Sequence, residues 1–100
     1  MKYEFHPEAE LEVLEVAARY EAEVRGLGLQ FGEEVERVIE LLLDSPDLGA
    51  PVDSDIRHFV LRRFPFSVIY VVVGEVLYIL AVAHGSRVPG YWLSRLRQRG

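Results

Sequence analysis

The sequence predicts an α+β fold in which a helical hairpin packs on a four-stranded, largely antiparallel sheet and a short helix ends the chain. Two observations support this prediction. Apolar residues recur at helical spacing in two early stretches that only Gly26-Leu27-Gly28 separates. Two later stretches, 66–73 and 76–84, are almost continuously apolar and rich in the β-branched and aromatic residues that strands favour. With 100 residues, half of them apolar, we expect a single domain over residues 1–100.

The chain is predicted to begin with a strand and a helix. Residues 2–6 alternate weakly between polar and apolar side chains, which indicates a short strand. Pro7 then suits the first position of a helix, because its missing N–H would have no partner there anyway. The apolar positions that follow at helical spacing are Val13, Ala17, Tyr20 and Val24. They predict an amphipathic helix to about Arg25, with its glutamates on the solvated faces.

A second helix follows the break at 26–28 and ends at Ser45-Pro46. One of its faces is apolar and consists of Phe31, Val35, Val38, Ile39 and Leu42. Because the break is short, the two helices must run antiparallel. Residues 47–55, which include Gly49 and Pro51, are predicted to form a loop.

Three strands are predicted next, over residues 56–61, 66–73 and 76–84. The dipeptide Gly74-Glu75 suits a two-residue turn of type II′ between the last two. Since these two strands are apolar throughout, we expect both to be inner strands. Counting strands along the chain, the predicted order is 2-3-4-1, with the first and second strands at the edges. The tail 89–99 is expected to form one or two helical turns.

A membrane-spanning helix is the alternative for residues 66–83, eighteen residues with a single charge. Glu75, at the centre of this stretch and next to Gly74, makes the hairpin the better interpretation, because a carboxylate at mid-membrane costs about 2.5 to 3.5 kcal/mol. The first eight residues also lack the apolar core of a signal peptide. We therefore expect a cytoplasmic protein that does not interact with membranes.

Cysteine and histidine usage excludes several classes of site. The chain has no cysteine, so it holds no disulfide, thiolate metal site or cysteine nucleophile. Its three histidines, His6, His58 and His84, are too scattered to predict a metal site, and we expect no cofactor.

Charge is divided unevenly along the chain. Residues 1–55 hold 15 acids and 4 bases, a net charge of 4 − 15 = −11, whereas residues 56–100 hold 1 acid and 7 bases, a net charge of 7 − 1 = +6. All seven bases are arginines, whose planar forks suit phosphates and carboxylates. They are Arg57, Arg62, Arg63, Arg87, Arg95, Arg97 and Arg99. A polyanion could therefore dock on the second half of the chain.

The order of strand, two helices, three-strand meander and basic tail resembles the RelE/ParE toxin superfamily of type II toxin–antitoxin modules. The local matches are His6-Pro7-Glu8-Ala9, Gly26-Leu27-Gly28, and Arg62-Arg63-Phe64-Pro65-Phe66 leading into Ile69-Tyr70. The best match is Ala81-Val82-Ala83-His84-Gly85-Ser86-Arg87-Val88-Pro89-Gly90-Tyr91-Trp92, which resembles the C-terminal segment of plasmid stabilisation proteins in that superfamily. The resemblance covers about 90 residues.

The resemblance implies one of two activities, and in both cases neutralisation by an antitoxin. RelE-like members are metal-free endoribonucleases that cut mRNA on the ribosome, whereas ParE-like members inhibit DNA gyrase. We expect the first activity, with gyrase inhibition, or a degenerate member that only binds antitoxin, as alternatives.

RNA cleavage without a metal needs proton transfer and stabilisation of the phosphate charge. The candidate catalytic residues are His84 as acid or base, Arg87 on the phosphate, and Tyr91 for base stacking or proton transfer. The resemblance places Arg87 and Tyr91 near an arginine and a tyrosine of RelE-like nucleases, and His84 near a histidine of some relatives. The candidate substrate-binding residues are Arg57, Arg62 and Arg63.

Two features disfavour the nuclease. Ser67 stands where RelE-like enzymes commonly carry an arginine, and the chain is acidic overall.

We also expect one face of the sheet to stay uncovered and to bind an antitoxin segment. This segment should fold on contact and be acidic near Arg62, Arg63 and Arg87.

Overall fold

The structure is a computed structural model that describes residues 1–98. Arg99, which ends the predicted tail helix, lies outside the described residues. The elements in chain order are β1 (Lys2–Phe5), α1 (Pro7–Glu23), α2 (Leu27–Asp44), β2 (Ala50–Asp53), β3 (Ile56–Val60), β4 (Phe66–Val73), β5 (Val76–His84) and the 3₁₀ helix η1 (Leu93–Gln98). The α+β fold and its helical hairpin are thus confirmed.

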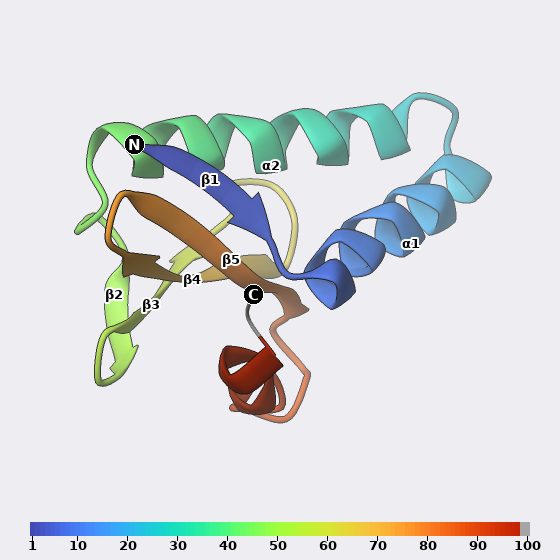
Figure 1. Cartoon of the computed structure of the whole chain (residues 1–100). Helices are drawn as coiled ribbons and strands as arrows, with labels where there is room; N and C mark the ends of the chain where they lie inside the picture. Colours follow the sequence, from blue (N-terminus) through green and yellow to red (C-terminus); the bar gives the residue numbers. More distant parts are fainter. Residues whose placement is uncertain (99–100) are drawn as a thin grey trace.

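The sheet has five strands in the order β1-β5-β4-β3-β2 (Figure 1). β1 pairs with β5 in parallel, and every other pairing is antiparallel. The predicted order of four strands is confirmed. The prediction of a loop over 47–55 is wrong at residues 50–53, because β2 adds a fifth strand there and makes β3 an inner strand. β2 is short, exposed throughout and contains Pro51, so its side chains lack a strand pattern, and its main chain alone pairs it with β3.

The hairpin of α1 and α2 is closed by a side chain that the sequence placed on a solvated face. Gly26 adopts the left-handed conformation with φ +88°, which an L side chain rarely adopts. Glu21 accepts hydrogen bonds from the backbone N–H groups of Gly26, at 2.8 Å, and Gly28, at 3.0 Å. This carboxylate therefore satisfies two donors at the start of α2.

Both faces of the sheet are covered. The helices pack on one face, over a core that includes Phe31, Val38 and Leu42 from α2. The tail with η1 lies on the other side of the sheet (Figure 1), where Trp92 packs with Leu80 and Ala81. The expectation that this face stays open for a partner is therefore wrong over this core, because the chain folds back on itself.

None of the helices within residues 1–98 is long and apolar enough to cross a membrane.

Candidate functional site

The site begins where β5 loses its neighbour β1. The last bond between them runs from the His6 N–H to the Ile79 carbonyl, at 2.9 Å, after which the chain turns into α1. The pairing of β5 with β4 also shifts by one residue, so that Ile79 and Ala81 pair with consecutive residues of β4 and Leu80 is bulged. On the side that β1 no longer covers, the N–H and C=O groups of β5 beyond Ile79 therefore need other hydrogen-bond partners.

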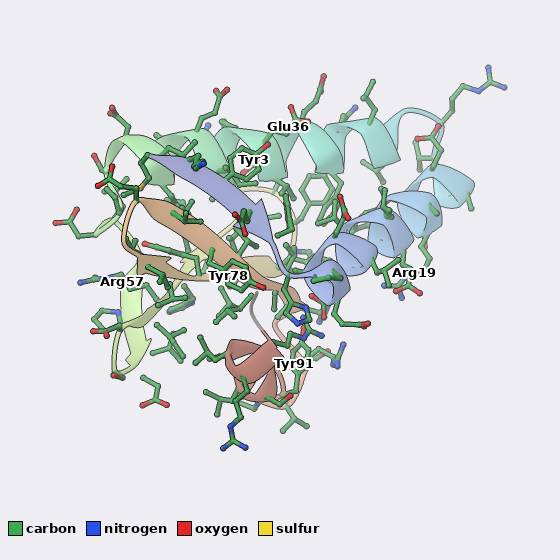
Figure 2. The ribbon with its side chains drawn as sticks, in the orientation of Figure 1. Tyr3, Arg19, Glu36, Arg57, Tyr78 and Tyr91 are labelled. Atoms are coloured by element: carbon green, nitrogen blue, oxygen red, sulfur yellow. The ribbon has the colours of Figure 1, made fainter. Side chains whose placement is uncertain are left out.

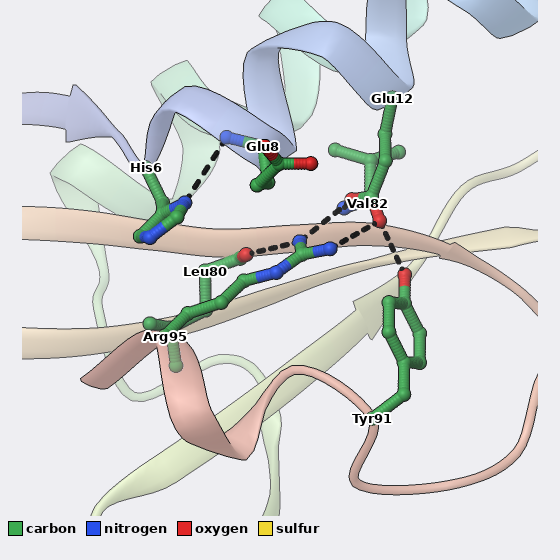
Figure 3. Close-up of polar contacts among 7 residues, drawn as sticks. All are labelled: His6, Glu8, Glu12, Leu80, Val82, Tyr91 and Arg95. Carbon is green, nitrogen blue, oxygen red and sulfur yellow. Dashed lines mark hydrogen bonds and ion pairs between the residues drawn. The ribbon is translucent and has the colours of Figure 1, made fainter. Parts of the chain in front are cut away.

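Side chains of Glu12 in α1 and Arg95 in η1 supply them (Figure 3). Glu12 accepts from the Val82 N–H at 3.0 Å, and Arg95 donates to the Leu80 carbonyl at 2.9 Å. The two side chains also form a bidentate pair, at 3.1 and 2.9 Å. Their exposed fractions are only 14% for Glu12 and 12% for Arg95. We call Glu12, Arg95 and Tyr91 the Glu12 clamp, because together they fasten α1 and the tail to the edge of β5.

Tyr91 belongs to the clamp through its hydroxyl, which donates to Glu12 at 2.7 Å. Burial raises the pKa of Tyr91, and the bond to the Glu12 carboxylate raises it further. The phenol therefore stays protonated with its proton directed at Glu12. The Arg87 guanidinium lies over the Tyr91 ring, 3.9 Å from its centroid, and Arg95 lies 5.1 Å from the same centroid.

His84 and Arg87 stand together just beyond the clamp. His84 ends β5, with its ring edge-on to Phe66 at 5.0 Å between centroids, and Nδ1 accepts the Ser86 backbone N–H at 3.0 Å. Both residues line a cleft against α1 whose wall includes Arg19 and Glu15. They also line a second cleft, between the tail and the β2–β3 side of the sheet, where Ser67 and His58 lie. The predicted catalytic residues His84, Arg87 and Tyr91 are thus neighbours.

Arg62 and Arg63 lie at the same end of the sheet, in the turn between β3 and β4. That turn touches the one after β5, since the Gly85 N–H donates to the Pro65 carbonyl at 2.9 Å. Glu34 of α2 accepts from the Arg62 N–H at 2.7 Å and forms two bonds with Arg37, at 2.9 and 2.8 Å. The bonds to Arg37 and to the Arg62 N–H outweigh partial burial and lower the pKa of Glu34 to about 2.

Arg57 does not join the other candidates. Its guanidinium donates to the carbonyls of Gly49, at 2.7 Å, and Asp47, at 3.3 Å, and so holds the chain before β2. Figure 2 shows Arg57 on the opposite side of the molecule from Arg19 and well apart from Tyr91. Of the six predicted site residues, the structure gathers five at one end of the sheet and leaves Arg57 elsewhere.

Sequence reasoning missed four residues of this site: Glu12, Arg19, Ser86 and Arg95. Glu12 has the same spacing as the solvated glutamates of its helix, and its partners lie 70 to 83 residues away. Arg19 is an exposed helical arginine like any other, and Ser86 acts through its backbone N–H. None of these roles leaves a local pattern. Within residues 1–98, no group of three or more histidine, aspartate or glutamate side chains could hold a metal ion.

Comparison with known proteins identifies relatives. Residues 3–89 match the family described as the ParE toxin of the type II toxin–antitoxin system parDE. A structure of the chromosomal ParDE toxin–antitoxin system from P. aeruginosa is similar, with a TM-score of 0.71 and 20% identity over 84% of this chain and 95% of that one. The isolated E. coli RelE toxin has a TM-score of 0.61 and 20% identity over 97% of each chain. No curated protein matches the sequence.

Proposed function

This chain belongs to the ParE toxin family of type II toxin–antitoxin systems, and from that premise we propose that it acts without cutting RNA, by binding and inhibiting DNA gyrase. Membership of the family also implies an antitoxin as its partner. Both the proposed target and the antitoxin would be met in the cytoplasm. The resemblance links gyrase inhibition to ParE-like toxins and mRNA cleavage to RelE-like ones.

The main support for this proposal is the state of Tyr91. Its hydroxyl proton is directed at Glu12, whose two oxygens also receive Arg95 and the Val82 N–H. Its ring faces the Arg87 guanidinium. A tyrosine held in this way is not free to stack on a base or to exchange a proton with RNA. The residue therefore supports the fold of the tail.

The charges around the site give independent support. A protein that binds RNA along its backbone needs a surplus of positive charge. In the cleft under α1, Arg19 and Arg87 stand beside Glu12 and Glu15. Arg57, which would hold a flanking phosphate, is engaged with its own main chain at the other side of the molecule. Ser67 adds no charge where RelE-like enzymes commonly carry an arginine.

The test uses two purified targets in parallel. We expect the protein to inhibit supercoiling of relaxed plasmid by gyrase and to leave mRNA intact on programmed ribosomes. His84→Ala should inhibit gyrase as the wild type does, because this mechanism needs no proton transfer. Cleavage of the message together with unchanged supercoiling would refute the proposal.

The ribosome-dependent endoribonuclease is the second candidate, because His84 and Arg87 line one cleft three residues apart. In that mechanism Arg87 would stabilise the phosphate charge, and Arg87→Ala should lower cleavage by about 10² to 10³-fold. His84 would transfer a proton, and His84→Ala should cost about 10² to 10⁴-fold. Both variants should stay folded, since both side chains are exposed.

A further inference from the structure

The Arg87 guanidinium is a hydrogen-bond donor that is oriented in advance, and none of its N–H groups has an acceptor within residues 1–98. Its guanidinium rests on the Tyr91 ring, which the Glu12 clamp holds in place. No hydrogen bond or ion pair found among residues 1–98 uses the Arg87 guanidinium. A guanidinium stacked on a ring keeps its N–H groups directed outward in its own plane, where they suit a bidentate acceptor.

His84 is a second donor, because Ser86 determines where its proton lies. The Ser86 N–H donates to Nδ1 at 3.0 Å, which requires a lone pair on that nitrogen, so the neutral ring carries its proton on Nε2. The Ser86 hydroxyl, 2.8 Å from Nδ1, can donate to it as well. A general base would need the lone pair on Nε2, and a general acid would need protons on both nitrogens. Either state breaks the Ser86 N–H bond, so the ring is arranged to donate from Nε2.

From these two donors we propose that His84 and Arg87 form a binding site for one carboxylate, supplied by an aspartate or glutamate of the antitoxin. Arg87 would hold the carboxylate through its fork, and the Nε2–H of His84 would donate to it as well. Arg19, across the cleft, adds positive charge, while Glu15 on the same wall disfavours a polyanion such as RNA. The inference rests on the proposed function only in taking an antitoxin as the partner, and it holds whichever target the toxin inhibits.

The first test measures binding of the protein encoded by the small gene adjacent to the toxin gene. Arg87→Ala should weaken this binding by at least about 30-fold, the usual loss when one partner of a buried charge pair is removed. Arg25→Ala, at the exposed helical hairpin, is the matched control and should bind as the wild type does. Equal affinities of the two variants, or no binding by the wild type, would overturn the proposal.

A pair of substitutions at His84 separates its two nitrogens. In His84→Asn the amide oxygen lies near the position of Nδ1, so the Ser86 N–H keeps an acceptor but the outward donor is lost. In His84→Gln the amide can donate from near the position of Nε2. We expect binding to fall about 10-fold or more in the Asn variant and less in the Gln variant. Wild-type affinity in His84→Asn would contradict the role of Nε2–H.

The tautomer can be observed directly in nitrogen-15 NMR spectra of the imidazole rings. We expect His84 to carry its proton on Nε2 in the wild type and in Ser86→Ala, which keeps the backbone N–H. Ser86→Pro, which removes that N–H, should allow both tautomers. A proton on Nδ1 in the wild type or in Ser86→Ala would overturn the assignment, even if the proline variant does not fold.

The nature of the bound group is tested from the partner's side. Each aspartate and glutamate of the antitoxin is changed to its amide, and binding is measured to the wild-type toxin and to Arg87→Ala. One acid should weaken binding to the wild type but have little effect on Arg87→Ala, the pattern that indicates direct contact. Purely additive effects for every acid would overturn the carboxylate site. So would a short single-stranded RNA that displaces the antitoxin from the wild type but not from Arg87→Ala. If the protein binds the antitoxin as described but does not inhibit gyrase, these affinities stay the same. Failure of the proposed function can therefore be told apart from failure of the carboxylate site.

Discussion

At the scale of single residues, Glu12 has the largest structural role of the glutamates in α1. It accepts hydrogen bonds from the tail and from the free edge of β5, and its side chain is almost buried together with Arg95. Removing one partner of a buried ion pair lowers the free energy of unfolding, because the remaining charge is left buried without a counter-charge. The Glu12 carboxylate is therefore expected to contribute more to the stability of the fold than the exposed glutamates of α1 do.

Glu12→Gln should lower the free energy of unfolding by about 3 kcal/mol, since the amide cannot accept from both nitrogens of Arg95 and from Tyr91. Glu15→Gln, an exposed change one turn along the same helix, should stay within about 0.5 kcal/mol of the wild type. Urea unfolding followed by circular dichroism measures both. Similar losses in the two variants would show that the clamp does not stabilise the fold.

Glu34 predicts a pH dependence whose sign follows from its lowered pKa. Arg37 and the Arg62 N–H favour the charged carboxylate in the folded protein, so its pKa falls from 4.5 to about 2. Stabilisation by this group is complete above about pH 4.5 and is lost as the pH falls toward 2. The gap in unfolding free energy between the wild type and Glu34→Gln should therefore narrow over that range. A gap that is constant with pH would contradict this.

At the scale of elements, the helical hairpin depends on one close approach. A Cβ atom on Gly28 would overlap with the Ala17 carbonyl and lie 3.0 Å from Glu21, whereas a Cβ on Gly32 would meet no atom within 4 Å. Gly28→Ala should therefore destabilise the protein. Gly32→Ala, in the same helix, should stabilise it by about 0.5 to 1 kcal/mol, because glycine is a poor helix former. Thermal unfolding midpoints of Gly28→Ala and Gly32→Ala test this difference. Equal shifts of the two midpoints from the wild type would refute it.

The start of β2 depends on Tyr70. This fully buried tyrosine donates to the Pro46 carbonyl at 2.6 Å and accepts the Gly49 N–H at 2.9 Å. Tyr70→Phe would leave both groups without this partner and should cost about 1 to 3 kcal/mol. The exposed Tyr3→Phe is its control and should have almost no effect. Hydrogen exchange at Gly49 should quicken in the Tyr70 variant alone; unchanged exchange there would contradict the role of Tyr70.

The elements that the sequence predicts most clearly are those with a helical apolar stripe or a continuous apolar run. The helices α1 and α2 turn an apolar stripe toward the sheet, and β4 and β5 bury almost continuous apolar runs, so the pattern predicts these four elements. β2 buries none, and its pairing through the main chain leaves no trace in the side chains. The bulge at Leu80 is equally hidden, because the apolar run continues through it.

At the scale of the whole molecule, closeness in the chain accounts for the grouping of the candidate residues at and after the end of β5 but not for how they are fixed there. His84, Arg87 and Tyr91 lie close together in the chain, so their proximity was expected. The Glu12 clamp joins residues 79 and 83 positions apart, and only the packing of α1 against the tail creates it. Packing of the tail against the sheet, through Trp92 and Leu96, covers the face that was expected to stay open for a partner.

Gyrase inhibition without mRNA cleavage is tested in one culture, at the first sign of growth arrest after induction of the wild-type protein. Plasmid superhelicity and the 5′ ends of ribosome-bound mRNA are mapped from the same cells. If the protein inhibits gyrase, we expect plasmid that has lost negative supercoiling and message that is intact. Message with new ends inside codons, normal superhelicity, and loss of both the cuts and the arrest in Arg87→Ala would contradict it and identify the protein as a nuclease.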